Sequence, residues 1–420
     1  MLKQIIVKIR NEKLLTKRET FCAILILYLF FGLIMWLAGL FSKGMASKQT
    51  AALLLLQDFL ADFTNVVGYS AKLDPYHNWF YSGPSEKAYP PLVYLIFYLF
   101  SGLVDIDQYY EANFFVSMYK DPLMIYMFML IHIGIYVFIF ESFRKVFTTK
   151  RFYAVGIAFL VLFSEPMLFS LERGNTVIVT MLFISVFLFN YDNKSKVMRE
   201  IAILSLALAA AFKMTPAVLG LLLLTDRKNR NLAIRAIIYG VLLFGLPFFF
   251  LNDNPFRSGV QLIRNIQGNM QAYSRWNGVT LEACLWEAGI KIDQTILIVI
   301  KYLVCAFLIF GVFITKEKWK QVMMISLVLT TFPNHSSYYC ILYMIPAFIV
   351  FLNEKQHKPV DWLIFIAALS ILQPYQNRIL HFISTGNCVL ILCGVMIGYI
   401  IKELIDRKNG MITIKPIEST

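Results

Sequence analysis

The chain has 420 residues, of which 58% are hydrophobic and only 15% are charged. That charge content is too low for a soluble domain of this length. The net charge of +13 does not indicate nucleic-acid binding, because lysines and arginines cluster in short segments between apolar runs. Composition therefore predicts an all-α, polytopic membrane protein whose partner is the lipid bilayer.

Apolar runs recur along the whole chain, and the first, 21–41, is long enough to cross a bilayer. Several later runs are too short to cross unassisted, which indicates broken or tilted helices. We expect about 11–13 transmembrane or re-entrant helices in one integral-membrane domain, 1–420. The candidate segments are 21–41, 90–104, 122–142, 152–170, 175–191, 201–225, 232–251, 295–315, 321–333, 338–352, 360–373 and 379–401.

Loop charge predicts the orientation. The segment before residue 21 and most short loops are basic, so the positive-inside rule places them and the N-terminus in the cytoplasm. The two long polar segments, 43–89 and 252–294, are nearly balanced in charge, so we expect both to be extracytoplasmic loops. They would share one outer surface of a multi-pass cell-membrane protein.

Two segments leave the number of crossings open. If 90–104 crosses, the basic loop 143–151 lies outside; if 90–104 only dips into the bilayer, that loop stays inside. Segment 201–225 is interrupted at Lys213-Met-Thr-Pro216 and has basic loops at both ends. Charge favours a hairpin of two half-helices, whose irregular turn must line a cavity or pack within protein.

The first long loop contains the strongest candidate for catalysis. Asp58 and Asp62 stand one helical turn apart in an aromatic setting, followed by Asp74-Pro75-Tyr76 and Tyr89-Pro90-Pro91. A carboxylate at a membrane surface is costly to leave unpaired. Partly desolvated, it can accept the proton of an attacking hydroxyl. The alternative is an ordinary solvated face of a surface helix.

Three cations could hold an anionic ligand. Arg173, in Glu172-Arg-Gly-Asn175, could grip a phosphate with two hydrogen bonds, or could pair with Glu172. Lys213 has no charged neighbour in its apolar segment, so it needs either an anionic ligand or an ion pair with another helix. His335 could donate to a phosphate or play a structural role beside its turn.

The order of these motifs resembles the GT-C superfamily of integral-membrane glycosyltransferases. The motifs are an acidic Asp-Phe loop after the first helix, Asp-Pro-Tyr, Tyr-Pro-Pro, Glu-Arg-Gly-Asn, Ala-Phe-Lys-Met-Thr-Pro and a late histidine motif. Within that superfamily the chain is most similar to glycosyltransferase family 87, the polyprenyl-phosphate-mannose-dependent transferases of bacteria. The resemblance runs from about residue 20 to about 350, although Phe332-Pro-Asn-His335-Ser departs from the family's aromatic–histidine pattern.

The resemblance implies a GT-C-like helical bundle with its active site at the outer membrane face. The donor would be a hexose, mannose by family, on a polyprenyl phosphate, and the acceptor an envelope glycan or glycolipid. Asp62 would be the catalytic base and Asp58 the second choice. Neither a cofactor nor a metal is expected, even though Asp105-Ile106-Asp107 has a form that binds metals in many sugar transferases. The remaining implied residues are Arg173, Lys213 and His335 at the donor phosphate, and Tyr76, Tyr89 and Asn175 along the substrate loop.

Two other functions remain open from sequence. A lipid-linked-glycan flippase would use Lys213 and His132 along a transport pathway, but one interrupted segment is not the pair of matching breaks that such transporters show. An envelope polysaccharide polymerase or ligase would use a large outer loop with arginines, which Arg257, Arg264 and Arg275 permit.

Overall fold

The computed structural model describes residues 15–41, 60–77, 87–106, 121–273, 278–334, 336–374 and 383–409. The predicted site residues Asp58 and His335 lie outside these ranges. Within them the chain is almost entirely helical, apart from the short antiparallel pair β1 (Thr16–Lys17) and β2 (Gln356–His357). The predicted all-α class is confirmed.

Among the described residues, five helices are long and apolar enough to cross a membrane, or six if the bent pair α8–α9 is one span. The bend between those two helices is 43°. The chain is therefore a polytopic membrane protein, as composition predicts. These elements are α2 (Arg18–Phe41), α7 (Pro122–Val146), α8 (Arg151–Val161), α9 (Glu165–Arg173), α12 (Arg230–Gly245) with η5 (Arg227–Asn229) and η6 (Leu246–Phe250), α15 (Gln294–Ile314) and α19 (Thr385–Lys408).

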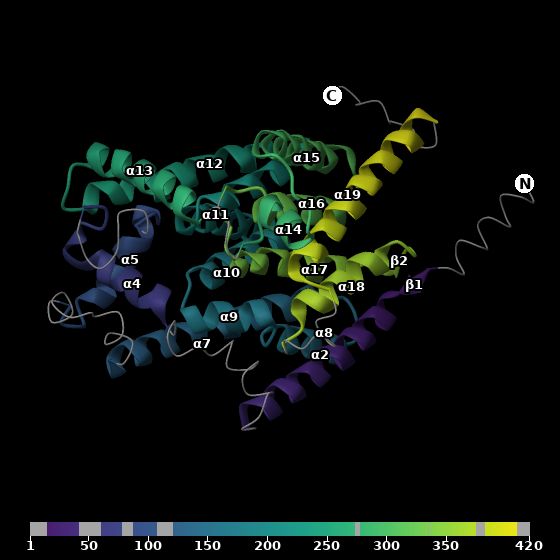
Figure 1. The fold of residues 1–420 in the computed structure, drawn as a ribbon, viewed down its shortest axis with the longest axis horizontal. Coiled ribbons are helices and arrows are strands. Elements are labelled where there is room, and N and C mark those ends of the chain that lie inside the picture. Colours follow the sequence, from purple (N-terminus) through teal and green to yellow (C-terminus); the bar gives the residue numbers. More distant parts are fainter. Residues whose placement is uncertain are drawn as a thin grey trace, which may run out of the picture.

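Shorter helices fill the centre of the bundle (Figure 1). Every residue of α17 is buried, and most of α16 is buried as well. Elements too short to cross a bilayer are tolerated here because other helices, rather than lipid, surround their ends. They are α10 (Val177–Asn190), α11 (Lys196–Phe212), η4 (Thr215–Leu224), α16 (Lys318–Thr331), η7 (Tyr338–Met344), α17 (Ile345–Leu352) and α18 (Asp361–Leu372). A further short helix, α5 (Pro91–Ser101), lies at one end of the bundle.

Segments 90–104 and 201–225, whose crossings the sequence leaves open, both have structures that do not require a full crossing of the bilayer. Helix α5 has only 11 residues, which is shorter than a bilayer requires. Segment 201–225 breaks at Lys213, where the backbone becomes extended, and η4 packs back against α11. Gly220 and Leu206, each seven residues from Lys213, lie so close that a Cβ on Gly220 would be 3.8 Å from Leu206 Cδ2. Lys213 therefore sits at the turn of a hairpin.

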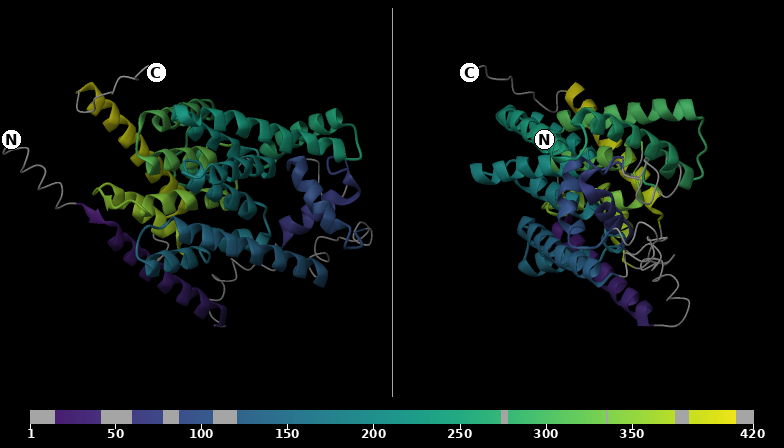
Figure 2. Two further views of the ribbon diagram at one scale, coloured as in Figure 1. Left: turned by 180° about the vertical axis from the view of Figure 1, so that it is seen from behind. Right: turned by 90° about the vertical axis from the view of Figure 1, so that its left-hand side faces the viewer.

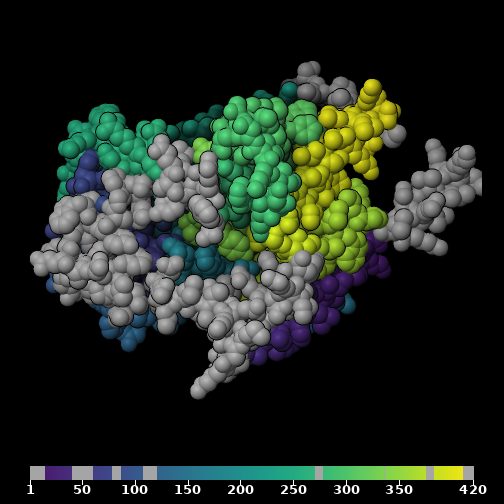
Figure 3. Space-filling model, viewed as in Figure 1, coloured from purple at the N-terminus to yellow at the C-terminus, as the bar shows by residue number. Residues whose placement is uncertain are grey.

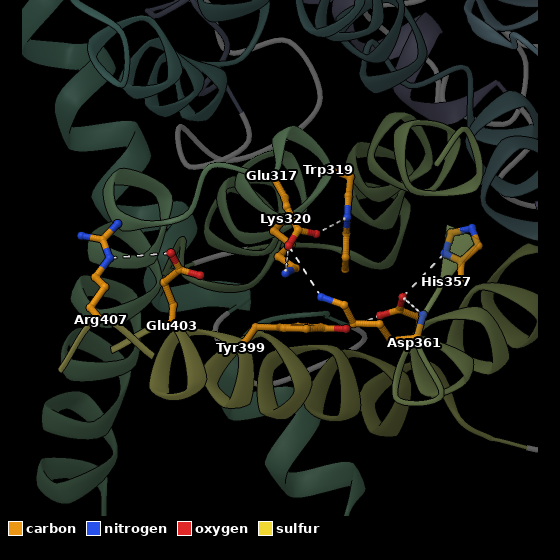
Figure 4. A network of polar contacts seen from close by, with 9 residues as sticks. Glu317, Trp319, Lys320, His357, Asp361, Tyr399, Glu403 and Arg407 are labelled. Carbon is orange, nitrogen blue, oxygen red and sulfur yellow. Dashed lines mark hydrogen bonds and ion pairs between the residues drawn. The ribbon is translucent and has the colours of Figure 1, made fainter. Parts of the chain in front are cut away.

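One end of the bundle gathers several of the predicted cytoplasmic loops. Arg18 Nη1 donates to Thr148 Oγ1 at 2.8 Å and to the carbonyl of Asn353 at 3.2 Å. Beside this contact, buried Lys320 lies 2.5 Å from Glu317, and its ammonium covers the ring of Tyr399 (Figure 4). Tyr399 in turn donates to the buried carboxylate of Asp361. The Arg18 contacts join the N-terminus of α2 to the ends of α7 and α17, and the Lys320 and Tyr399 contacts join α16, α18 and α19.

The opposite end carries α4 (Ala61–Ser70), η1 (Ala71–Leu73), α5 and α13 (Pro255–Tyr273), as two further views also show (Figures 1 and 2). A second hydrophobic core, separate from that of the main bundle, holds α4 and α5 against α7 and η6. The segment predicted as the second long loop, 252–294, contains α13 and α14 (Leu281–Glu287). Helix α14 packs against α19, and Figure 3 shows the two side by side.

Candidate active site

The end of α9 is shaped by Gly174, which adopts a left-handed conformation with φ +66°. Its N–H bonds to the carbonyl of Leu171 at 3.0 Å, and the N–H of Asn175 reaches back to Ser170 at 3.1 Å. This is the usual glycine-terminated helix end, in which late carbonyls accept bonds from residues beyond the helix. The turn brings Arg173 and Asn175, on either side of the glycine, toward the same neighbour.

That neighbour is the first turn of α4. The N–H of Leu60 donates to the carbonyl of Glu172 at 2.8 Å, which fixes the start of α4 to the end of α9. Asp62 lies in the first turn of α4, where the helix dipole favours a negative charge. Residues more than a hundred positions apart thus meet through one backbone hydrogen bond.

Both oxygens of the Asp62 carboxylate have donors. Arg173 Nη2 donates to Oδ1 at 2.9 Å and Arg173 Nε donates to Oδ2 at 3.0 Å, a bidentate pairing. Asn175 Nδ2 donates to Oδ2 at 2.6 Å, while its Oδ1 accepts the N–H of Val177 at 2.9 Å and so fixes the amide. The side chains of Asp62 and Arg173 remain 15% and 25% exposed, so a ligand can still approach this pair.

Lys213 and Tyr89 contact each other near Asp62. The Lys213 ammonium lies 4.3 Å from the centre of the Tyr89 ring, a favourable cation–π contact. Lys213 and Tyr89 are both within electrostatic reach of Asp62. Burial, with a further contribution from the Asp62 charge, holds the pKa of Tyr89 well above its ordinary value, so its phenol stays protonated.

Tyr76 holds the backbone of Tyr89 in place. Its side chain is only 2% exposed, and its hydroxyl donates to the carbonyl of Tyr89 at 2.9 Å. The Tyr76 ring meets the ring of Tyr94 edge to face, with 5.3 Å between centroids. Tyr76 therefore fixes the backbone of the Tyr-Pro-Pro motif.

Sequence reasoning did not single out two neighbours of Asp62. Asn65, one turn later on α4, has a buried Oδ1 without a hydrogen-bond partner in the described part of the chain. Tyr339 stacks on Phe169 of α9, with 6.4 Å between centroids, and lies within electrostatic reach of Asp62 and Arg173. The Asp-Phe-Thr-Asn spacing puts Asn65 on the same helix face as Asp62, whereas no sequence signal marks Tyr339.

The close approach of α4 and α9 predicts a strong effect of Gly174→Ala. A Cβ at this position would lie 2.7 Å from Phe63 Cβ and 3.1 Å from Phe128 Cε2, in a backbone conformation that alanine disfavours. We expect a loss of about 2–5 kcal/mol from strain and overpacking, measured as a melting temperature in detergent lowered by several degrees.

Gly240→Ala in α12 is the matched control, because among the described residues no atom outside its own helix turns lies within 4 Å of a Cβ added there. We expect this helical substitution to leave stability unchanged or slightly raised. Equal melting temperatures for Gly174→Ala and the wild type would show that α4 does not depend on this close approach.

Comparison with protein families gives a match. The family model for glycosyltransferase family 87 matches residues 88–333, more than half of the chain. No curated protein and no solved structure matches the chain. The matched range includes Tyr89, Arg173, Asn175 and Lys213, and Asp62, which lies outside it, is bonded to two of them. The chain is a membrane glycosyltransferase that belongs to glycosyltransferase family 87.

Proposed function

We propose that the chain transfers a hexosyl residue, mannose by family, from a polyprenyl-phosphate donor to a glycan or glycolipid of the cell envelope. The observation that carries this proposal is the contact of Asp62 with Arg173 and Asn175, with Lys213 and Tyr89 close by. A partly exposed carboxylate and a partly buried lysine in one region are what this chemistry needs: a base for the acceptor and a cation for the leaving phosphate.

Asp62 is the proposed general base. It removes the proton of an acceptor hydroxyl as that oxygen attacks the anomeric carbon. The bond from this carbon to the phosphate oxygen breaks, and polyprenyl phosphate leaves with the bonding electrons. Attack from the face opposite the phosphate inverts the anomeric configuration.

We assign different roles to Arg173 and Lys213. Arg173 already holds both oxygens of Asp62, so we assign it and Asn175 to positioning the base. Within the part of the chain that the structure describes, Lys213 makes no such pairing with a carboxylate, and it faces the ring of Tyr89 instead. We therefore assign the donor phosphate to Lys213. The protonated phenol of Tyr89 is a second donor for the same phosphate.

We infer the orientation from charge. The basic loops meet at the end that holds β1, β2, the Lys320–Glu317 ion pair and the Tyr399–Asp361 hydrogen bond, and α4, which carries Asp62, lies toward the other end (Figure 1). The positive-inside rule then places Asp62 on the extracytoplasmic side. Family membership favours the transferase over the flippase, since a flippase forms no glycosidic bond.

The test is an assay of the purified protein in liposomes with a polyprenyl-phosphate hexose and an acceptor glycolipid. We expect glycolipid product and an equal amount of polyprenyl phosphate, with mannose the preferred sugar among epimeric donors. Polyprenyl diphosphate as the released lipid would instead indicate a polymerase or ligase. Movement of the donor between leaflets without glycosidic product would indicate a flippase.

The positioning role of Arg173 makes a separate prediction. Arg173→Lys keeps the charge but loses the paired guanidinium hydrogen bonds, so the carboxylate of Asp62 would lose its fixed orientation. We expect kcat to fall about 10- to 100-fold, because small misplacements of a catalytic group have effects of this size. The Kd for the donor, measured by isothermal titration, should change less than threefold. A large rise in donor Kd with unchanged kcat would show that Arg173 binds the donor phosphate instead.

A further inference from the structure

Helix α13 has three distinct faces. One face is buried and consists of Ser258, Leu262 and Asn265. A second face is apolar but exposed: the side chains of Phe256, Val260 and Ile263 are 82%, 50% and 57% exposed.

The third face lies beside the apolar one and is basic. It carries Arg257, which is 70% exposed, and Arg264 one heptad further along. An amphipathic helix with a buried face needs no second apolar stripe for folding. The apolar stripe therefore requires a partner outside the helix bundle; it is flanked by Arg264 and by Arg257, whose Nη1 lies 3.8 Å from Asp253 Oδ1.

The position of α13 in the chain indicates what that partner is. The candidate membrane span Arg227–Phe250 ends five residues before α13 begins. The last residues of this span are exposed as well, with Phe249 at 68% and Phe250 at 66%, and η6 packs against α13. The exposed apolar surface thus continues from a lipid-facing span onto α13.

The buried face of α13 is tied to the candidate active site. Asn265, which is 1% exposed, donates from Nδ2 to the carbonyl of Lys87 at 3.1 Å, two residues before Tyr89. Just before α13, the N–H of Asn252 donates to the carbonyl of Leu73 at 2.8 Å. Displacement of α13 would therefore move the segment that carries Tyr76 and Tyr89.

We infer that α13 is an interfacial helix that binds the anionic phospholipid surface. Phe256, Val260 and Ile263 enter the acyl boundary, and Arg257 and Arg264 contact lipid phosphates. An apolar stripe flanked by arginines is the pattern of helices that lie on anionic membranes. Through Asn265 and Asn252 the bound lipid surface holds the loop that carries Tyr89. An acidic glycan is the competing ligand for the two arginines, but it would leave the exposed aliphatic side chains of Val260 and Ile263 in water.

Hydrogen exchange of the full-length protein in nanodiscs tests this inference without any assay of transfer. Nanodiscs of phosphatidylcholine alone are compared with nanodiscs that also contain phosphatidylglycerol. We expect the amides of 255–273 to exchange more slowly with the anionic lipid. Each arginine near an anionic surface contributes about fivefold, so the two together would slow exchange about 25-fold at low salt. High salt should reduce the difference by screening.

Arg257→Gln with Arg264→Gln should remove the effect of phosphatidylglycerol, and Phe256→Ser with Val260→Ser should raise exchange in both lipids. The matched control is Arg227→Gln with Arg230→Gln at the start of α12, which should leave the exchange of α13 unchanged. Equal exchange in the two nanodiscs would overturn the inference. A lipid effect that persists without both arginines, or protection of α13 by a soluble acidic oligosaccharide in phosphatidylcholine, would overturn it as well.

Discussion

Asp62→Asn is expected to lower kcat for glycosyl transfer by about 10²- to 10⁴-fold, the usual contribution of a general base. Asparagine keeps the size of the side chain and can still accept a bond from Arg173, but it cannot take the acceptor proton. The measurement is product formation by purified protein with saturating donor and acceptor. A melting temperature within a few degrees of the wild type would show that the loss is chemical.

Asp192→Asn is the matched control for this substitution. Asp192 also pairs with a cation, with 2.8 Å between its Oδ1 and Lys318 Nζ, but this pair joins the turn after α10 to the start of α16. We expect its activity to stay within twofold of the wild type. If the Asp62→Asn variant keeps more than a tenth of the wild-type kcat, Asp62 is not the general base.

Lys213→Met is expected to lower kcat/KM for the donor by about 10²- to 10³-fold. Methionine fills a similar volume in the hairpin turn but offers no charge to the leaving phosphate, and loss of one such electrostatic contact has effects of this size. Lys213→Arg should recover part of the activity because it restores the charge. The measurement is the initial rate over a series of donor concentrations.

Lys145→Met provides the comparison for Lys213. Lys145 is 72% exposed and lies at the end of α7, at the basic end of the bundle. Loss of this lysine should change kcat/KM by less than twofold. A Lys213→Met variant with a wild-type donor dependence would show that the phosphate binds elsewhere.

Much of the fold can be predicted from the sequence because membrane helices obey strong local rules. Apolar runs such as 122–142 and 295–315 coincide with α7 and α15, since length and hydrophobicity alone decide a crossing. The break at Lys213 is also readable, because a lysine before Met-Thr-Pro216 interrupts an apolar helix. The helices within 252–294 cannot be read from the sequence. Helix α13 has too few apolar residues to resemble a membrane segment, and its two exposed faces obscure the periodicity of its buried residues.

The pairing of Arg173 with Asp62 could not be predicted. From the sequence, Asp62 is a candidate base and Arg173 either a phosphate ligand or a partner of Glu172. Their contact depends on the left-handed turn at Gly174 and on the backbone bond from Leu60 to Glu172, which join segments 111 residues apart. Sequence spacing contains no information about such a contact. The structure therefore changes the proposed role of Arg173 from holding a phosphate to positioning a carboxylate.

The anomeric configuration of the product tests the central claim most directly. If Asp62 is the catalytic base and Lys213 binds the leaving phosphate, the acceptor hydroxyl attacks the anomeric carbon directly. Two-dimensional NMR of the isolated glycolipid would then show a glycosidic bond inverted relative to the polyprenyl-phosphate donor, formed only by protein that has Asp62. A retained configuration, or an inverted product formed equally well by Asp62→Asn, would contradict the claim.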